Sequence, residues 1–191
     1  EKQAAAAVGQ CELMFLYDKF FGEYGNITGQ LLVTKDDFEN EERHGNLHNA
    51  FMKLFEYGAL PIVNENDSVA VDEIVFGDND SLSAHVAKIV DADLLVILTD
   101  IDGLFSANPA EDENAVLISC VDGITDDILA LAGGSGTNRG TGGMVTKLHA
   151  AKIATESGIN TVVMNGADPE DIYKLIDGRK IGTLLKARGV Q

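Results

Sequence analysis

Short apolar runs without any alternation of polar and apolar residues recur along the chain, and stretches with helical spacing separate them. The run at residues 94–98, Leu-Leu-Val-Ile-Leu, is the most strand-like. A strand that is apolar on both faces must be covered on both faces, which is typical of parallel sheets flanked by helices. The chain therefore predicts an α/β fold with a mainly parallel sheet.

The predicted elements alternate along the chain. Strands are expected at residues 30–34, 60–63, 94–98, 116–120, 161–164 and 182–185. Helices are expected at residues 3–21, 36–56, 81–90, 124–131, 144–157 and 169–176. Residues 69–76 predict a further β excursion or hairpin.

The first predicted helix opens the chain without a start signal. Residues 4–7 are alanines that suit a helix interior, and no Ser, Thr, Asp or Asn cap precedes them. This opening favours the hypothesis that the chain is a domain whose N-terminal portion is missing. Five apolar residues recur at helical spacing and predict a face turned toward the core. They are Val8, Leu13, Leu16, Tyr17 and Phe20.

The charge balance limits the partners that the chain can bind. With 14 basic and 31 acidic residues, the formal net charge is −17, so nucleic acid and anionic membranes are unfavourable partners. A hydrophobic content of 45% suffices for a sizeable core. No run approaches a membrane span and no signal segment opens the chain, so we expect a cytoplasmic protein. Cys11 and Cys120 are then expected to be buried free thiols.

Polar residues follow three of the predicted strands. Residues 64–67 read Asn-Glu-Asn-Asp, residues 99–100 read Thr-Asp, and residues 165–166 read Asn-Gly. A fourth polar group, Gly-Asp-Asn-Asp-Ser at residues 77–81, opens a helix. Any one of these alone is more often a solvated turn or a helix cap. Because ligands of open α/β sheets bind beyond the carboxyl ends of the strands, their coincidence favours a binding site.

The polar group that opens the helix is not a calcium loop. The residue two positions after Asp80 is the apolar Leu82, and the closing glutamate of the calcium-loop motif is absent. A better interpretation is that Asn79 and the backbone N–H groups of the helix start hold a carboxylate. The carboxylates of Asp67, Asp78 and Asp80 can hold an ammonium group, Mg²⁺ or a lysine. This combination suits an amino acid ligand.

A glycine-rich segment at residues 133–143 lacks the Gly-Lys-Ser/Thr ending of a P-loop. Glycines followed by a helix still form a phosphate cradle. Lys147 falls in the early turns of that helix, where the helix dipole disfavours a cation by a few tenths of a kcal/mol. An anionic ligand would compensate, and the alternative is an ordinary surface lysine.

Four segments match one known group of enzymes in order and spacing. They are residues 64–67, 77–84 (Gly-Asp-Asn-Asp-Ser-Leu-Ser-Ala), 98–104 (Leu-Thr-Asp-Ile-Asp-Gly-Leu) and 140–147 (Gly-Thr-Gly-Gly-Met-Val-Thr-Lys). Together they resemble the bacterial glutamate 5-kinases of the amino acid kinase family. Residues 7–10 and 182–184 are similar too, so the resemblance covers practically the whole chain.

The resemblance implies a three-layer αβα sandwich with a mainly parallel central sheet, formed by residues 1–191 as a catalytic domain. The family's first strand, its phosphate-binding lysine and its serine loop would then lie upstream of Glu1, and no C-terminal PUA-type domain is expected. The implied reaction is phosphorylation of the L-glutamate side-chain carboxylate from ATP with Mg²⁺, the first step of proline biosynthesis. The resemblance also suggests a homo-oligomer, a dimer or tetramer, and leaves open whether proline inhibits the enzyme.

The resemblance further implies roles for single residues. Asp67 and Asn79 match glutamate-binding positions, and Asn64 and Asp78 line the same pocket. The nucleotide-binding positions are Thr99, Asp100, Thr141, Gly142, Gly143, Met144, Val145, Thr146 and Lys147. Asp80 and Lys147 match the catalytic pair placed closest to the transferred phosphoryl group, and no protein metal ligand is expected.

Two alternatives remain at this point. A sibling kinase that acts on aspartate, acetylglutamate or a nucleoside monophosphate would share the fold but should differ at residues 64–67 and 77–80. The other alternative is a non-catalytic module that senses glutamate or proline. A phosphate-binding lysine and glycine loop encoded upstream would distinguish the kinase from the sensor.

Overall fold

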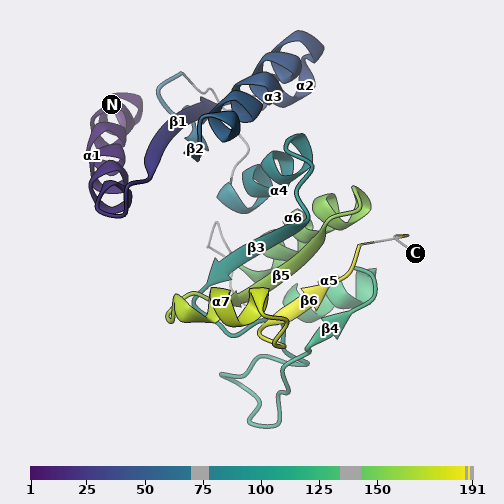
Figure 1. The fold of residues 1–191 in the computed structure, drawn as a ribbon. Coiled ribbons are helices and arrows are strands. Elements are labelled where there is room, and N and C mark those ends of the chain that lie inside the picture. Colours follow the sequence, from purple (N-terminus) through teal and green to yellow (C-terminus); the bar gives the residue numbers. More distant parts are fainter. Residues whose placement is uncertain (70–77, 134–142, 188, 190–191) are drawn as a thin grey trace. The chain divides into compact units, whose positions relative to one another are not determined.

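The computed structural model of the chain describes residues 1–69, 78–133, 143–187 and 189. The chain divides into two compact units, residues 1–82 and residues 83–191. Figure 1 labels the helices and strands of both. The predicted β excursion at residues 69–76 lies, except for Val69, outside the described residues.

The first unit is built around two parallel strands. Its elements are α1 (Lys2–Gly22), β1 (Ile27–Val33), α2 (Asp36–Glu39), α3 (Glu41–Glu56) and β2 (Ala59–Glu65), and α4 (Asn79–Ile89) crosses the boundary between the units. Helices α2 and α3 connect β1 to β2, as the crossover between parallel strands requires. Asn40 divides the single helix predicted at residues 36–56, because its side-chain oxygen caps α3 by accepting from the N–H of Arg43 at 3.1 Å.

Helix α1 forms as predicted, but the prediction that its apolar face turns toward the core is wrong. None of its residues is buried. The five predicted core residues are all exposed: Val8 by 74%, Leu13 by 37%, Leu16 by 40%, Tyr17 by 36% and Phe20 by 56%. Apolar residues stand on every side of this helix, so their spacing could not indicate which side meets β1.

The second unit holds a four-stranded sheet in the order β3-β5-β6-β4. Its elements are β3 (Leu94–Thr99), β4 (Cys120–Val121), α5 (Asp126–Gly133), α6 (Met144–Glu156), β5 (Asn160–Asn165), α7 (Glu170–Ile176) and β6 (Thr183–Leu185). The pairs β3–β5 and β4–β6 are parallel, and β5–β6 is antiparallel. The predicted mainly parallel sheet is therefore confirmed, with one antiparallel pair.

The strand predicted at residues 116–120 is mostly wrong. Leu117 forms only an isolated antiparallel bridge with Phe105, and the regular strand β4 begins at Cys120. The Ser106 hydroxyl oxygen accepts from the N–H of Val116 at 3.0 Å, which uses a backbone group that a longer strand would pair. Cys11 and Cys120 are free thiols as predicted, but both are exposed rather than buried.

The core of the second unit lies between α6 and the sheet. Helix α6 packs on β5 and β3, and Figure 1 shows α5 and α6 behind the sheet. Leu148, Ala151 and Ala154 of α6 are fully buried, as are Val163 and Met164 of β5. The small residues on this side of α6 let the helix approach the strands closely. This packing fixes the position of the start of α6.

Candidate functional site

Strands β3 and β5 end side by side in the second unit. Thr99 pairs with Asn165 in parallel register, and the N–H of Gly166 donates to the Thr99 carbonyl at 2.9 Å. The Thr99 hydroxyl donates to Asp100 Oδ1 at 3.2 Å, and the Asn165 amide donates to Asp102 Oδ1 at 2.9 Å. The predicted pair of Thr99 and Asp100 therefore lies at the carboxyl edge of the sheet.

The start of α6 lies at this same edge. Helix α6 directly precedes β5 and packs against it, so the two run in opposite directions. Its 13 residues span about 20 Å at 1.5 Å each. The six residues of β5 also span about 20 Å at 3.3 Å each. The N-terminus of α6 is thereby placed level with the carboxyl ends of β3 and β5.

Lys147 stands in the early turns of α6 and is buried, with only 7% of its surface exposed. A buried ammonium group is unfavourable unless anionic or hydrogen-bonding groups stabilise its charge. The interpretation of Lys147 as an ordinary surface lysine is therefore wrong. Its role in nucleotide binding, with Thr99 and Asp100, stays a prediction.

The helix start that leads to Lys147 is only partly described. Gly143 is the N-cap of α6, and the Thr146 hydroxyl donates to its carbonyl at 2.8 Å. Met144 and Val145 complete the first turn. The predicted nucleotide-binding residues Thr141 and Gly142 lie outside the described residues.

The predicted glutamate-binding residues Asn64 and Asp67 belong to the first unit. Asn64 lies in β2 and not in a loop, because Asn64 and Glu65 continue the pairing with Leu32 and Val33 of β1. The strand predicted at residues 60–63 therefore extends two residues further, to Glu65. Asp67 is exposed in the turn that follows β2.

The start of α4 carries three more predicted residues. Asp78 caps this helix, because its carboxylate accepts from the N–H of Ser81 at 2.6 Å and from the Ser81 hydroxyl at 3.1 Å. The helix-cap alternative is thus correct for Asp78, and its role in lining a glutamate pocket stays a prediction. Asn79 is exposed at the first helical position, and Asp80 is half-buried in the first turn.

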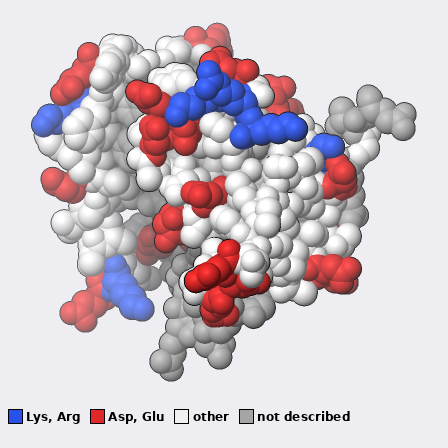
Figure 2. Space-filling view, turned by 90° about the horizontal axis from the view of Figure 1, so that it is seen from below, with Lys and Arg blue, Asp and Glu red and all other residues white. Residues whose placement is uncertain are grey.

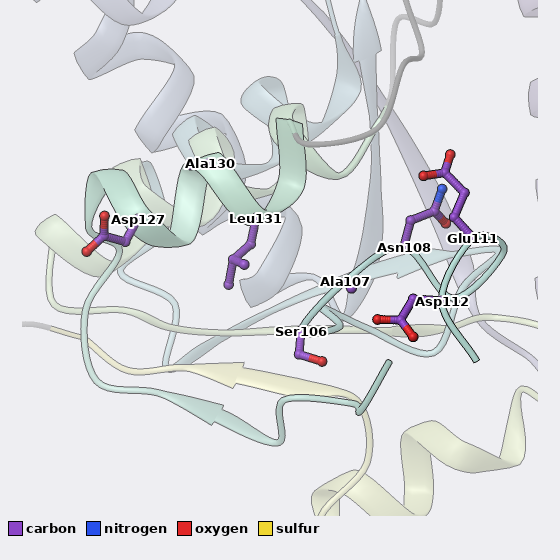
Figure 3. A pocket seen from close by; sticks show the side chains of 8 residues that line it. All are labelled: Ser106, Ala107, Asn108, Glu111, Asp112, Asp127, Ala130 and Leu131. Carbon is purple, nitrogen blue, oxygen red and sulfur yellow. The ribbon is translucent and has the colours of Figure 1, made fainter. Parts of the chain in front are cut away.

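A cavity that the sequence did not predict lies in the second unit. Figure 3 shows it between the loop that follows β3 and helix α5, with a volume of about 530 Å³. It is lined by Ser106, Ala107, Asn108, Glu111, Asp112, Asp127, Ala130 and Leu131. Its carboxylates disfavour a phosphate group, whereas its apolar and polar lining suits an uncharged or cationic group.

Comparison with known proteins identifies the class. The amino acid kinase family model matches residues 1–165, so the chain belongs to the amino acid kinase family. The glutamate 5-kinase of Clostridium acetobutylicum is 53% identical over 185 residues, covering 97% of this chain and 69% of that protein. The glutamate 5-kinase of Clostridium perfringens is 51% identical over 192 residues, covering 98% of this chain and 71% of that protein. The resemblance predicted from the sequence is confirmed.

Solved structures of more distant proteins share the fold. The product complex of T. acidophilum isopentenyl phosphate kinase has a TM-score of 0.62 at 18% identity, over 93% of this chain and 67% of that chain. The UMP kinase of Bacillus anthracis has a TM-score of 0.54 at 15% identity, over 74% of this chain and 52% of that chain. These similarities confirm the predicted α/β amino acid kinase fold.

Proposed function

We propose that the chain is the catalytic domain of a glutamate 5-kinase, which transfers the γ-phosphoryl group of ATP to the side-chain carboxylate of L-glutamate. The products are ADP and L-glutamyl 5-phosphate, and the reaction is the first step of proline biosynthesis. The observation that carries the proposal is the burial of Lys147 in the first turns of α6, the helix that packs on the two strands ending at Thr99 and Asn165. The identities of 53% and 51% to enzymes of that name support it.

Both reactants are anions, so the main task of the site is to stabilise negative charge. Lys147 supplies a cation in a buried position, where its attraction to phosphoryl oxygens is stronger than in water. The N-terminus of α6 adds the positive end of the helix dipole. No covalent nucleophile is required, because positioning and charge stabilisation supply most of the catalysis of phosphoryl transfer. Asp80 is the second proposed catalytic residue.

Magnesium is proposed to arrive with the nucleotide. Across the described ranges, no group of three or more His, Cys, Asp or Glu residues could hold a metal ion. Mg²⁺ is usually bound by substrate phosphates, waters and one or two carboxylates rather than by a cage of protein ligands. Asp100 at the carboxyl edge is one carboxylate that suits this role. Bound there, Mg²⁺ would neutralise phosphate charge.

The residues proposed to bind glutamate, which accepts the phosphoryl group, belong to the first unit, and they are called the acceptor end below. The exposed carboxylate of Asp67 would pair with the ammonium group of glutamate, and Asn79 at the start of α4 would bind a carboxylate. Asn64 and Asp78 would support these two residues from β2 and from the N-cap of α4.

The environment and assembly of the enzyme are also proposals. We expect a homo-oligomer, because Val8, Phe15 and Phe20 of α1 expose 74%, 60% and 56% of their surface. None of the described helices is long and apolar enough to cross a membrane. Figure 2 shows acidic side chains spread over much of the face that it draws, which agrees with a net charge of −17. A cytoplasmic location stays an expectation from the sequence, and the resemblance leaves open whether proline inhibits the enzyme.

An acceptor assay of the purified enzyme tests the proposal. ADP release is measured with L-glutamate, aspartate, acetylglutamate and a nucleoside monophosphate, and L-glutamyl 5-phosphate is trapped as its hydroxamate. The proposal expects ADP release and trapped product with L-glutamate alone. Turnover with another acceptor would indicate a sibling kinase, and glutamate binding without ADP release would indicate a sensing module.

A variant pair on α6 connects that activity to the site. Lys147→Met should lower kcat by about 10² to 10³, because its charge acts mainly on the transition state. Lys152→Met is the matched control, since Lys152 lies on the same helix and is only half-buried. Equal kcat values for both variants would remove Lys147 from the catalytic group.

A further inference from the structure

A small cavity lies in the first unit, between α1 and the carboxyl ends of β1 and β2. Its volume is about 20 Å³. It is lined by Ala6, Ala7, Gln10, Leu32, Glu65, Asn66, Asp67 and Ser68. The proposed glutamate-binding residue Asp67 therefore shares this cavity with Gln10, a residue to which neither the sequence motifs nor the proposed function gives a role.

The hydrogen bonds around Asn64 fix the orientation of the Gln10 amide. Asn64 Oδ1 accepts from the backbone N–H of Glu65 at 3.0 Å, so Nδ2 must be the atom that faces Gln10. Asn64 Nδ2 donates at 3.1 Å, and the Gln10 atom that accepts is Oε1. The Nε2 donor of Gln10 is thereby turned away from Asn64.

Gln10 Nε2 is buried and has no hydrogen-bond partner among the described residues. A buried donor without a partner costs about 1 to 3 kcal/mol, and such groups are rare in native proteins. Three other residues that line the cavity, Glu65, Asp67 and Ser68, carry oxygen atoms that can accept a hydrogen bond. Neither carboxylate is bonded to Nε2 directly.

One water molecule fits both the size and the chemistry of this cavity. A water needs at least about 10 to 15 Å³ and two to four polar partners, and the cavity of about 20 Å³ meets both conditions. Water can accept from Gln10 Nε2 and donate to a carboxylate at the same time. An ammonium group could not accept from Nε2, and a carboxylate ligand would be repelled by Glu65 and Asp67.

We infer that Gln10 is a positioning residue of the acceptor site, which holds the turn carrying Asp67 through one buried water. Asn64 fixes the Gln10 amide, Gln10 binds the water, and the water fixes the Asp67 carboxylate for the ammonium group of the substrate. This inference rests on the proposed function, since it assumes that Asp67 binds glutamate. It assigns Gln10 to glutamate binding and not to the chemical step.

Two variants separate this role from simple packing. Gln10→Met removes both amide groups, whereas Gln10→Glu keeps an oxygen for Asn64 Nδ2 and replaces the donor by a carboxylate oxygen. At pH 8.5 both should raise the KM for glutamate by about 10- to 100-fold, as expected when a hydrogen bond that supports a charged pair is lost. The kcat and the KM for ATP should stay within about twofold of wild type. Gln3→Glu, which adds the same charge to α1, is the control and should leave all three constants unchanged.

The pH profile distinguishes positioning from a structural role. Glu65 and Asp67 line the cavity, and their charges raise the pKa of the carboxyl introduced by Gln10→Glu. As pH falls, that carboxyl gains a proton and becomes a donor again, so the KM for glutamate should approach the wild-type value measured at the same pH. Gln10→Met has no such group and should show no recovery.

The outcomes are distinct for the inference and for the proposed function. The positioning role would be overturned by an unchanged KM for glutamate in both Gln10 variants, or by equal rises in the KM for glutamate and the KM for ATP. Turnover of glutamate by the wild-type enzyme would still support the proposed kinase activity in either case. A wild-type enzyme that does not phosphorylate glutamate would overturn both the function and this role in it. The water between Gln10 and the carboxylates is tested separately by a crystal structure that shows ordered water. A water bonded to Gln10 Nε2 and to Asp67 or Glu65 supports it, and direct bonding of Nε2 to a protein oxygen overturns it.

Discussion

The two units of the chain differ in how completely they bury their apolar residues. In the second unit, residues from α4, β3, α6, β5 and β6 form one cluster in which Ala84, Leu148, Ala151, Val163 and Leu185 are fully buried. In the first unit, the longest helix, α1, has no buried residue. The second unit therefore closes a core of its own, whereas the first leaves its longest helix uncovered.

This difference follows the division of the proposed chemistry. The phosphate end, with Lys147, rests on α6 and the closed core beneath it. The acceptor end, with Asp67, rests on a turn beside α1. Because few buried apolar contacts mean low local stability, we expect the acceptor end to be the more adjustable of the two. The contrast predicts that equal changes will have unequal effects in the two units.

The largest single effect is expected at one of two glycines that share the same backbone conformation. Gly182 has φ +68°, and a Cβ there would lie 2.3 Å from the Val163 carbonyl oxygen. Gly58 has φ +67°, and a Cβ there meets nothing within 4 Å. Gly182→Ala should therefore lower the free energy of unfolding by about 2 to 6 kcal/mol, combining backbone strain with overpacking. Gly58→Ala carries only the strain, about 1 to 3 kcal/mol. Urea denaturation measures both, and equal losses would contradict the crowding at Gly182.

A leucine pair tests the contrast in the helices. Leu148 of α6 is fully buried, and Leu16 of α1 is 40% exposed. Leu148→Ala should lower the free energy of unfolding by about 2 to 5 kcal/mol, because it leaves a cavity in a packed core. Leu16→Ala should lower it by less than about 1 kcal/mol. If Leu16→Ala is as destabilising as Leu148→Ala, another surface covers α1 in solution, and the contrast between the units is wrong.

A threonine pair gives the smallest effect, of opposite sign. Thr161 of β5 is fully buried, and its hydroxyl has no hydrogen-bond partner among the described residues. Thr161→Val keeps the shape and removes the unpaired polar group, so it should raise the free energy of unfolding by about 1 kcal/mol. Thr28→Val, at a half-buried position of β1, is the matched control and should change stability by less than about 0.5 kcal/mol. A loss of stability in Thr161→Val would show that the hydroxyl is bonded in solution.

The sequence predicted where the helices and strands of the second unit lie more accurately than it predicted which residues pack or pair with each other. Strands β3 and β5 and helix α6 were predicted to within one or two residues, because continuous apolar runs and small-residue spacing are strong local signals. The wrong face of α1 and the wrong extent of β4 have a different cause. Which side of an apolar helix packs, and whether Leu117 pairs with Phe105 or continues a strand, depend on contacts distant in sequence.

The site shows the same limit. Residue types and the resemblance could place Lys147 and Asp67 in the candidate site, but they could not show that Lys147 is buried or that Asp78 caps α4. The role of Gln10 was also hidden, because it depends on an amide orientation set by Asn64, 54 residues away. The roles of all the predicted site residues, Lys147 and Asp67 included, stay predictions.

The most direct test measures the binding of each ligand separately by titration calorimetry. Wild type, Asp67→Ala and Lys147→Met are titrated with L-glutamate and with a non-hydrolysable ATP analogue in Mg²⁺. The account predicts that Asp67→Ala weakens glutamate binding by about 1.5 to 3 kcal/mol, because an ammonium group loses a charged hydrogen-bond partner, while nucleotide binding stays close to wild type. Lys147→Met should bind glutamate as wild type does. Equal losses of glutamate and nucleotide binding in Asp67→Ala would contradict the assignment of Asp67 to glutamate binding.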